Sequence, residues 1–222
     1  MDHTLSAVDA DLKVLSQDVA TLGDGAVTQI LAAVDVFLRH DVTAALGVVA
    51  ADDALDAQDI EIEKRAIRFI ALRQPMADDL RRPIAAMKMA MQLERCGDLA
   101  KNIAKRVGGM DGRPDAEQAQ AIGELGALVA ERLAAVIQAY RAGDAAGAHA
   151  VWANDTEVDI RHDAVLQRIL RGMTGDPKAV QVSTHLLFIA KNLERIGDHA
   201  TNVAELVYYQ LTGADLADRP KA

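Results

Sequence analysis

The sequence predicts an all-α protein built from two tandem three-helix bundles that are related by internal duplication. Half of the 222 residues are hydrophobic but only 3% are aromatic, and β-strands usually draw on aromatic and β-branched side chains. Apolar residues recur at steps of three and four over long stretches of the chain, which is the spacing of one buried helix face. A twelve-residue motif also occurs twice, 100 residues apart.

The first bundle should contain three helices. The opening segment shows helical periodicity on both sides of residues 23–25, so it forms either one long helix or two stacked pieces. The second helix should begin near Asp41, whose carboxylate can accept the free backbone amides of a helix start, and end before Pro75. The third should run from about residue 77 to about residue 107, with a bend or a restart near Pro83.

The second bundle should repeat this plan. Residues 108–117 concentrate Gly, Pro and Asp between two periodic segments, which is typical of a boundary. We therefore divide the chain into a first repeat, 1–111, and a second repeat, 112–222. The second repeat should hold one helix over residues 122–140, one that starts near Asp144 and one that follows the turn at 174–177.

The duplication is clearest in the repeated motif. Residues 93–104 read LERCGDLAKNIA and residues 193–204 read LERIGDHATNVA, with eight of twelve positions identical. Upstream aspartates also correspond, at a constant offset of 103: Asp41, Asp52 and Asp56 match Asp144, Asp155 and Asp159. One structural unit is therefore expected to occur twice.

Each motif places two carboxylates one helical turn apart. Glu94 and Asp98 are four residues apart, as are Glu194 and Asp198, and like charges at this spacing destabilise a helix mildly. A cation would relieve the repulsion, because adjacent carboxylates supply the oxygen ligands that hard or borderline metal ions accept. A solvated helix face is the alternative interpretation of any such acidic stripe.

The preceding helix can supply further ligands. A short connection makes the two helices of each pair antiparallel, so residues equidistant from the turn lie at the same depth. Asp56 and Glu94 each lie 19 residues from Pro75, and Asp52 and Asp98 each lie 23 residues from it. The corresponding pairs of the second repeat are also equidistant from their turn. The sequence thus predicts two four-carboxylate metal sites, formed by Asp52, Asp56, Glu94 and Asp98, and by Asp155, Asp159, Glu194 and Asp198.

Other residues of the motifs have structural interpretations. Gly97 and Gly197 each cost about 1 kcal/mol relative to alanine inside a helix, which predicts close approach of another helix or a ligand. Cys96 should be a small core residue, and Arg95 either a surface ion-pair partner or a brace for the carboxylates. Histidines are expected at surface or core positions, with His162, one turn beyond Asp159, the best candidate for a ligand.

Charge and hydropathy limit the partners and the location. The net charge is −9 and no long basic run occurs, which argues against binding to nucleic acids or to anionic membranes. The N-terminus lacks the pattern of a signal peptide, and no uninterrupted run of about 18 apolar residues appears. A cytoplasmic location without direct membrane insertion is expected.

The two LERxGD-x-A-x-N motifs, each preceded by a D-x-x-x-D pair, resemble those of the PhoU family over essentially the whole chain. The resemblance implies a negative regulator of phosphate uptake and of the phosphate-starvation response, acting on the phosphate ABC transporter, through its ATPase subunit, and on a sensor histidine kinase. It also implies a homodimer, and metal ions, iron or zinc above all, at the acidic motifs. This transfer is direct for Glu94, Asp98, Glu194 and Asp198 and less direct for the aspartates of the preceding helices.

Two other functions stay open at this point. A metal-free helical adaptor could use its acidic stripes to bind a basic partner surface. A carboxylate-bridged di-metal enzyme is the second, but such enzymes place Glu-x-x-His pairs on two helices, and this chain has none. The motifs also lack an evident base or nucleophile, so no enzymatic activity is expected.

Overall fold

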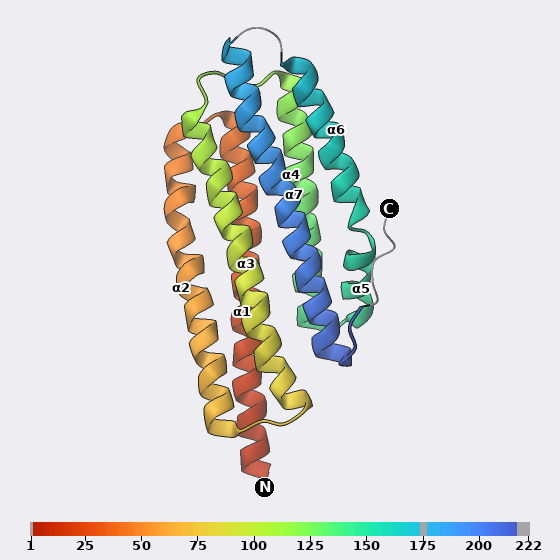
Figure 1. The fold of residues 1–222 in the computed structure, drawn as a ribbon. Coiled ribbons are helices and arrows are strands. Elements are labelled where there is room, and N and C mark those ends of the chain that lie inside the picture. Colours follow the sequence, from red (N-terminus) through yellow and green to blue (C-terminus); the bar gives the residue numbers. More distant parts are fainter. Residues whose placement is uncertain (1, 174–176, 217–222) are drawn as a thin grey trace.

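The computed structural model describes residues 2–173 and 177–216, which form seven α-helices and no strand. Figure 1 shows them as long, roughly parallel rods. The helices are α1 (Asp2–Arg39), α2 (Val42–Arg73), α3 (Asp78–Gly109), α4 (Ala116–Ala142), α5 (Ala145–Ala153), α6 (Thr156–Gly172) and α7 (Pro177–Thr212). The predicted all-α class is confirmed.

The first repeat contains the three helices that its sequence predicts. The opening segment is a single helix, α1, and α3 continues through Pro83 without a restart. The second repeat differs, because α5 and α6 replace the one helix expected after Asp144. Asn154 stands at the break where the first repeat has Ala51, and its side-chain amide donates to the Ala150 carbonyl at 2.7 Å. Asparagine favours such local bonds over helix continuation, so the middle helix of the three expected here is broken into two pieces.

The two repeats pack against each other through matching helices. α3 lies beside α7 and α1 beside α4, while α2 covers one flank and α5 with α6 the other (Figure 1). One cluster of buried hydrophobic side chains extends through both repeats. The predicted boundary after residue 111 therefore separates two sequence repeats that share a core.

The contact between α1 and α4 is reciprocal. Gly126 of α4 faces Val34 of α1, and a Cβ atom added to Gly126 would lie 2.5 Å from the Val34 Cγ2 atom. Gly23 of α1 likewise faces Ile137 of α4. At the offset of 103 that relates the repeats, Gly23 is equivalent to Gly126 and Val34 to Ile137, so the same contact occurs twice with the roles of the two helices exchanged. The halves are thus related by an approximate two-fold axis that passes between these helices.

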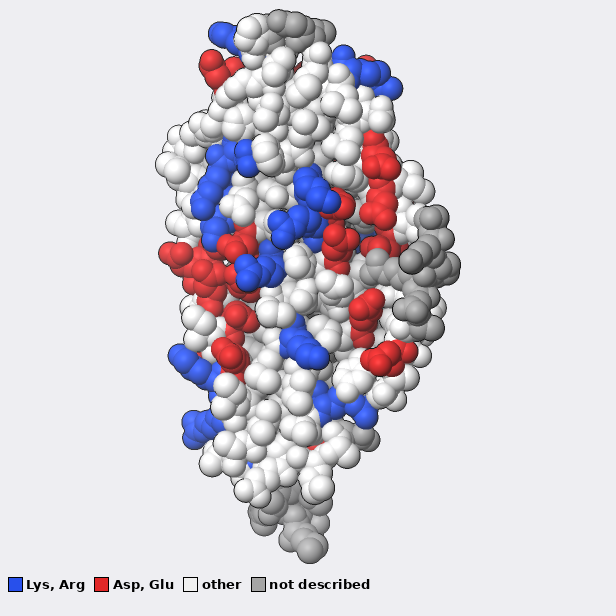
Figure 2. Space-filling view, in the orientation of Figure 1, with Lys and Arg blue, Asp and Glu red and all other residues white. Residues whose placement is uncertain are grey.

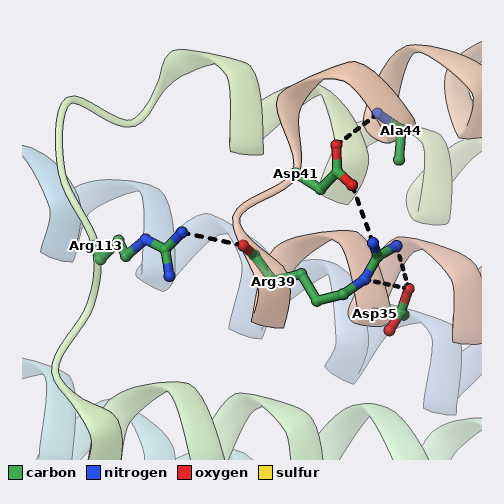
Figure 3. Close-up of polar contacts among 5 residues, drawn as sticks. All are labelled: Asp35, Arg39, Asp41, Ala44 and Arg113. Carbon is green, nitrogen blue, oxygen red and sulfur yellow. Dashed lines mark hydrogen bonds and ion pairs between the residues drawn. The ribbon is translucent and has the colours of Figure 1, made fainter.

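Hydrogen bonds fix the junction between α1 and α2 (Figure 3). As predicted, Asp41 caps α2, because its carboxylate accepts the Ala44 amide at 2.9 Å. Arg39 donates to Asp41 at 2.9 Å and pairs with Asp35. Arg113, from the segment that joins the repeats, donates to the Arg39 carbonyl at 3.3 Å. The linker is therefore fastened to the end of α1.

One segment of the described chain, Val8–Arg39, is long and apolar enough to cross a membrane by length and composition alone. Half of its most apolar window is buried inside the fold, and Val19, Leu22 and Ile30 are fully covered by neighbouring helices. We interpret it as the core helix of the first repeat.

The α1–α4 contact leads to a stability prediction. Gly126→Ala should lower the free energy of unfolding by about 1–3 kcal/mol, because the stiff, branched Val34 side chain must move. Gly47→Ala is the matched control: nothing lies within 4 Å of its added Cβ, so the substitution should raise stability by up to about 1 kcal/mol through helix propensity. Urea unfolding followed by circular dichroism measures both. Equal effects of the two substitutions would contradict the close contact.

Candidate metal sites

The eight predicted carboxylates lie in two groups, one in each repeat. Asp52 and Asp56 of α2 face the first motif on α3, and Asp159 of α6, with Asp155 at its start, faces the second motif on α7. Figure 2 shows acidic side chains gathered over α2 and α3 and again toward α6 and α7, with basic side chains between them. The predicted juxtaposition across each helix pair is confirmed; the role of these residues as ligands stays a prediction.

Close approach of the helices at the motif glycines produces this juxtaposition. A Cβ atom added to Gly97 would lie 2.6 Å from Leu55 Cδ1 and 3.2 Å from Asp52 Oδ1. One added to Gly197 would lie 2.8 Å from Val158 Cγ1. Leu55 and Val158 are equivalent residues of the two repeats. The prediction that these glycines admit a neighbouring helix is confirmed.

The first cluster contains a cation of its own. Asp52 is only 1% exposed, and its Oδ1 atom accepts the Gln29 amide at 3.0 Å. Lys101 Nζ pairs with the other oxygen of Asp52 and with Asp98 Oδ1 at 2.5 Å. These hydrogen bonds raise the pKa of Lys101, which keeps it protonated. One ammonium group therefore bridges the two helices.

The remaining carboxylates of the first cluster, Asp56 and Glu94, both have raised pKa values. Burial, and then the charges of Asp52 and Asp98, raises the pKa of Asp56, although Lys101 opposes the shift. Burial and the Asp98 charge also raise the pKa of Glu94. Arg95, whose side chain is 56% exposed, lies 3.6 Å from an oxygen of Glu94 and 3.6 Å from an oxygen of Asp98, which fits both of its predicted roles, surface ion-pair partner and brace.

The second cluster has a hydroxyl where the first has the ammonium. Thr201 occupies the position equivalent to Lys101, and its Oγ1 atom donates to Asp155 Oδ1 at 2.6 Å. Lys191, just before this motif, is 56% exposed and donates to Glu194 Oε1 at 2.7 Å. A neutral donor thus replaces the internal cation.

Electrostatic repulsion is correspondingly strong in the second cluster. Burial, together with the charges of Glu194, Asp155 and Asp159, raises the pKa of Asp198 to about 6. Burial, Asp155 and Glu194 likewise raise the pKa of Asp159. Among the described residues, neither Asp159 nor Asp198 forms an ion pair with a lysine or an arginine. Repulsion among these carboxylates is therefore not relieved by an ion pair at Asp159 or Asp198.

The histidines divide between packing and a possible ligand role. His199 lies between the repeats, with its Nδ1 atom 2.7 Å from Gln92 Oε1. His162 is 8% exposed, and its buried Nε2 atom has no hydrogen-bond partner among the described residues. When protonated, His162 lowers the pKa of neighbouring Asp159. Cys96 is fully buried, which raises the pKa of its thiol and confirms it as a core residue.

The donor set of the second cluster fits a metal ion better than that of the first. Thr201 takes the place of the bridging lysine there, and the Nε2 atom of His162, which has no hydrogen-bond partner among the described residues, belongs to a side chain one turn beyond Asp159. Within the described chain, no three Asp, Glu, His or Cys side chains already converge on one point. Binding therefore requires rotation of the carboxylates toward a shared ion, which their staggered rotamers allow.

Sequence analysis missed Gln29, Lys101 and Thr201, the residues that make the two clusters different. Lys101 and Thr201 are one of the four mismatches between the repeated motifs. Counting the mismatches rather than the identities would have drawn attention to this position. Gln29 carried no signal, because its contact with Asp52 depends on the packing of α1 against α2 and α3.

The fold and these clusters define a class: two-repeat helical proteins that carry paired acidic motifs on matching helices. The family model described as PhoU domain matches the chain twice, over residues 19–107 and 122–207. The chain belongs to the PhoU family.

Relatives match it over nearly the whole length. The chain is 45% identical over 222 residues to a phosphate-specific transport system accessory protein PhoU homolog of Caulobacter vibrioides, covering 99% of this chain and 96% of that protein. A homolog of the same name from Rhizobium meliloti is 38% identical over 221 residues, covering 99% of this chain and 93% of the relative. Family members named in this way are accessory proteins of phosphate transport.

Solved structures show the same fold. The crystal structure of PhoU from Pseudomonas aeruginosa aligns with a TM-score of 0.87 at 30% identity, covering 93% of this chain and 99% of that one. The phosphate transport system regulatory protein PhoU from Streptococcus pneumoniae aligns with a TM-score of 0.86 at 28% identity, covering 94% and 99%. The two-repeat helical architecture is therefore that of the family.

The raised pKa of Asp198 predicts that the free energy of unfolding depends on pH when the protein is kept free of metal by a chelator. The folded protein binds the proton of Asp198 more tightly than the unfolded chain does. Protonation of Asp198 therefore stabilises the fold below about pH 4, and this stabilisation is lost as the pH rises through about 6. Asp198→Asn, which carries no charge, should raise the free energy of unfolding at neutral pH and flatten its pH dependence. Asp111→Asn, at an exposed side chain in the segment between the repeats, should do neither. Urea unfolding across this range would contradict the repulsion if Asp198→Asn left the slope unchanged.

Proposed function

We propose that this protein is a negative regulator of phosphate uptake and of the phosphate-starvation response. It acts in the cytoplasm, as a homodimer, by contact with the ATPase subunit of the phosphate ABC transporter and with the sensor histidine kinase. Contact with the transporter when phosphate is plentiful biases the kinase toward its inactive state. The observation that carries the proposal is the 45% identity, over the whole chain, to a protein named for its accessory role in phosphate transport.

The action proposed is regulatory rather than enzymatic. The motif carboxylates lie between paired helices, and their neighbours include Lys101, Thr201 and Arg95. None of these is arranged as a nucleophile activated by a base, which is the usual mark of covalent catalysis. Long helical faces are well suited to contact with partner proteins. A di-metal enzyme and a metal-free adaptor are the alternatives that the tests below address.

We also propose that metal ions, iron or zinc, bind at the acidic clusters. Asp155, Asp159, Glu194 and Asp198 would hold the ion in the second repeat, with His162 as an additional donor. A bound cation supplies the positive charge that the packed carboxylates lack. It would tie α6 to α7 and fix the surface around the second motif. The sequence also predicts a site at Asp52, Asp56, Glu94 and Asp98, where Lys101 competes.

The regulatory role is tested in the cell. Deletion of the gene should switch on a phosphate-starvation reporter in phosphate-rich medium, and the wild-type gene supplied in trans should silence it again. Deletion of the kinase gene in the same strain should also silence the reporter, because the regulator acts through the kinase. A reporter that stays silent after the first deletion would rule out the repressor role.

Metal binding is tested on the purified protein. Elemental analysis of wild type should find iron or zinc, and replacement of Glu94, Asp98, Glu194 and Asp198 by alanine should remove it, because carboxylate oxygens are the ligands. The control replaces four exposed acidic residues away from the clusters: Asp35, Asp79, Asp111 and Glu117. Equal metal content in all three proteins would rule out the acidic clusters as the site, and wild type without metal would favour the metal-free adaptor.

A further inference from the structure

The two acidic clusters are equivalent in sequence but differ in one position that decides their charge. Lys101 and Thr201 occupy the same place in the repeated motif. The Lys101 ammonium contacts both Asp52 of α2 and Asp98 of α3. Thr201 makes the corresponding cross-helix contact, to Asp155, through a neutral hydroxyl. A side chain at this position therefore links the two helices in each repeat, through a cation in the first repeat and through a neutral hydroxyl in the second.

The lysine of the first cluster is held firmly. Its side chain is only 19% exposed, and Asp52 beneath it is 1% exposed. A metal ion entering this cluster must either lie beside an ammonium group or displace it from a buried carboxylate. Both are unfavourable, because like charges repel at close range and a buried charge that loses its partner is strongly destabilised. The residues of the first cluster therefore do not fit a metal ion.

The second cluster has no lysine at the position of Lys101. Lys191 is largely exposed and contacts only Glu194 among the motif carboxylates. Arg132 of α4 is the repeat equivalent of Gln29, and its guanidinium pairs with Glu157 of α6. The buried His162 nitrogen without a partner belongs to this repeat as well, because Asp59 stands at the equivalent position in the first.

We infer that Lys101 acts as a built-in substitute for a metal ion, so that this chain binds divalent cations at the second cluster only. The inference rests on the proposed metal binding and deepens it, because it assigns the two duplicated sites different roles. The first cluster is a permanent link between α2 and α3. The second is a link between α6 and α7 whose strength follows the supply of metal.

Exchange of the two residues tests the inference. Zn²⁺ is the probe, because it has no redox chemistry, and each protein is stripped with a chelator, loaded, dialysed and assayed for zinc by elemental analysis. Thr201→Lys should lose the zinc of wild type. Lys101→Thr should gain about twofold in zinc content, because it removes the ammonium group from the four carboxylates of the first cluster. Thr184→Lys and Lys105→Thr make the same changes of charge on the exposed faces of α7 and α3 and should leave the zinc content unchanged.

Two neutral double variants assign the zinc of wild type to a cluster. Glu194→Gln/Asp198→Asn should abolish zinc binding, and Glu94→Gln/Asp98→Asn should leave it unchanged. Because Lys101→Thr removes a partner of buried Asp52, circular dichroism checks its fold, and added Zn²⁺ should raise its melting temperature more than that of wild type. If this variant does not fold, Thr201→Lys and the double variants still decide the matter.

The outcomes separate the two proposals. Zinc that is lost in Glu94→Gln/Asp98→Asn, or retained in Thr201→Lys, would overturn the inference while leaving metal binding in place. Wild-type protein that takes up no zinc or iron would instead overturn the proposed metal binding itself. If zinc is lost in Thr201→Lys and in Glu194→Gln/Asp198→Asn but in none of the other variants, the result supports both metal binding and its restriction to the second cluster.

Discussion

The close approach of two helices at Gly97, and again at Gly197, is the constraint on which the rest of this structure depends. Without a side chain on these glycines, Leu55 and Val158 reach the motif helices. The same approach brings the aspartates of one helix level with the carboxylates of the other. Packing that buries apolar surface thus concentrates negative charge, and each repeat must relieve the resulting repulsion.

The repeats relieve it in different ways. The first uses its own lysine, which bridges Asp52 and Asp98 and needs no ligand. In the second, Thr201 satisfies Asp155 by a hydrogen bond but adds no charge, and Asp198 responds with a pKa raised to about 6. A duplicated unit has therefore kept its geometry while its electrostatics diverged. One half has a fixed link between helices, and we propose that the other has a link that responds to a cation.

The sequence was sufficient for the helices and for the depth of the acidic residues along them. Helical periodicity and the capping residue Asp41 defined α2, and counting from the turn matched Asp56 with Glu94. The break between α5 and α6 escaped prediction because it depends on one local competition, in which Asn154 bonds to its own helix. Rotation about a helix axis could not be derived from counting either. The contacts of Lys101 and Gln29 with Asp52 depend on that rotation and on packing between helices far apart in the chain.

A crystal structure of the wild-type protein grown with Zn²⁺, with diffraction data collected at the zinc absorption edge, tests the central claim most directly. Anomalous density should appear among Asp155, Asp159, Glu194 and Asp198. The Lys101 ammonium should remain between Asp52 and Asp98, with no anomalous density beside it. Zinc bound in the first cluster, with Lys101 displaced, would contradict the account.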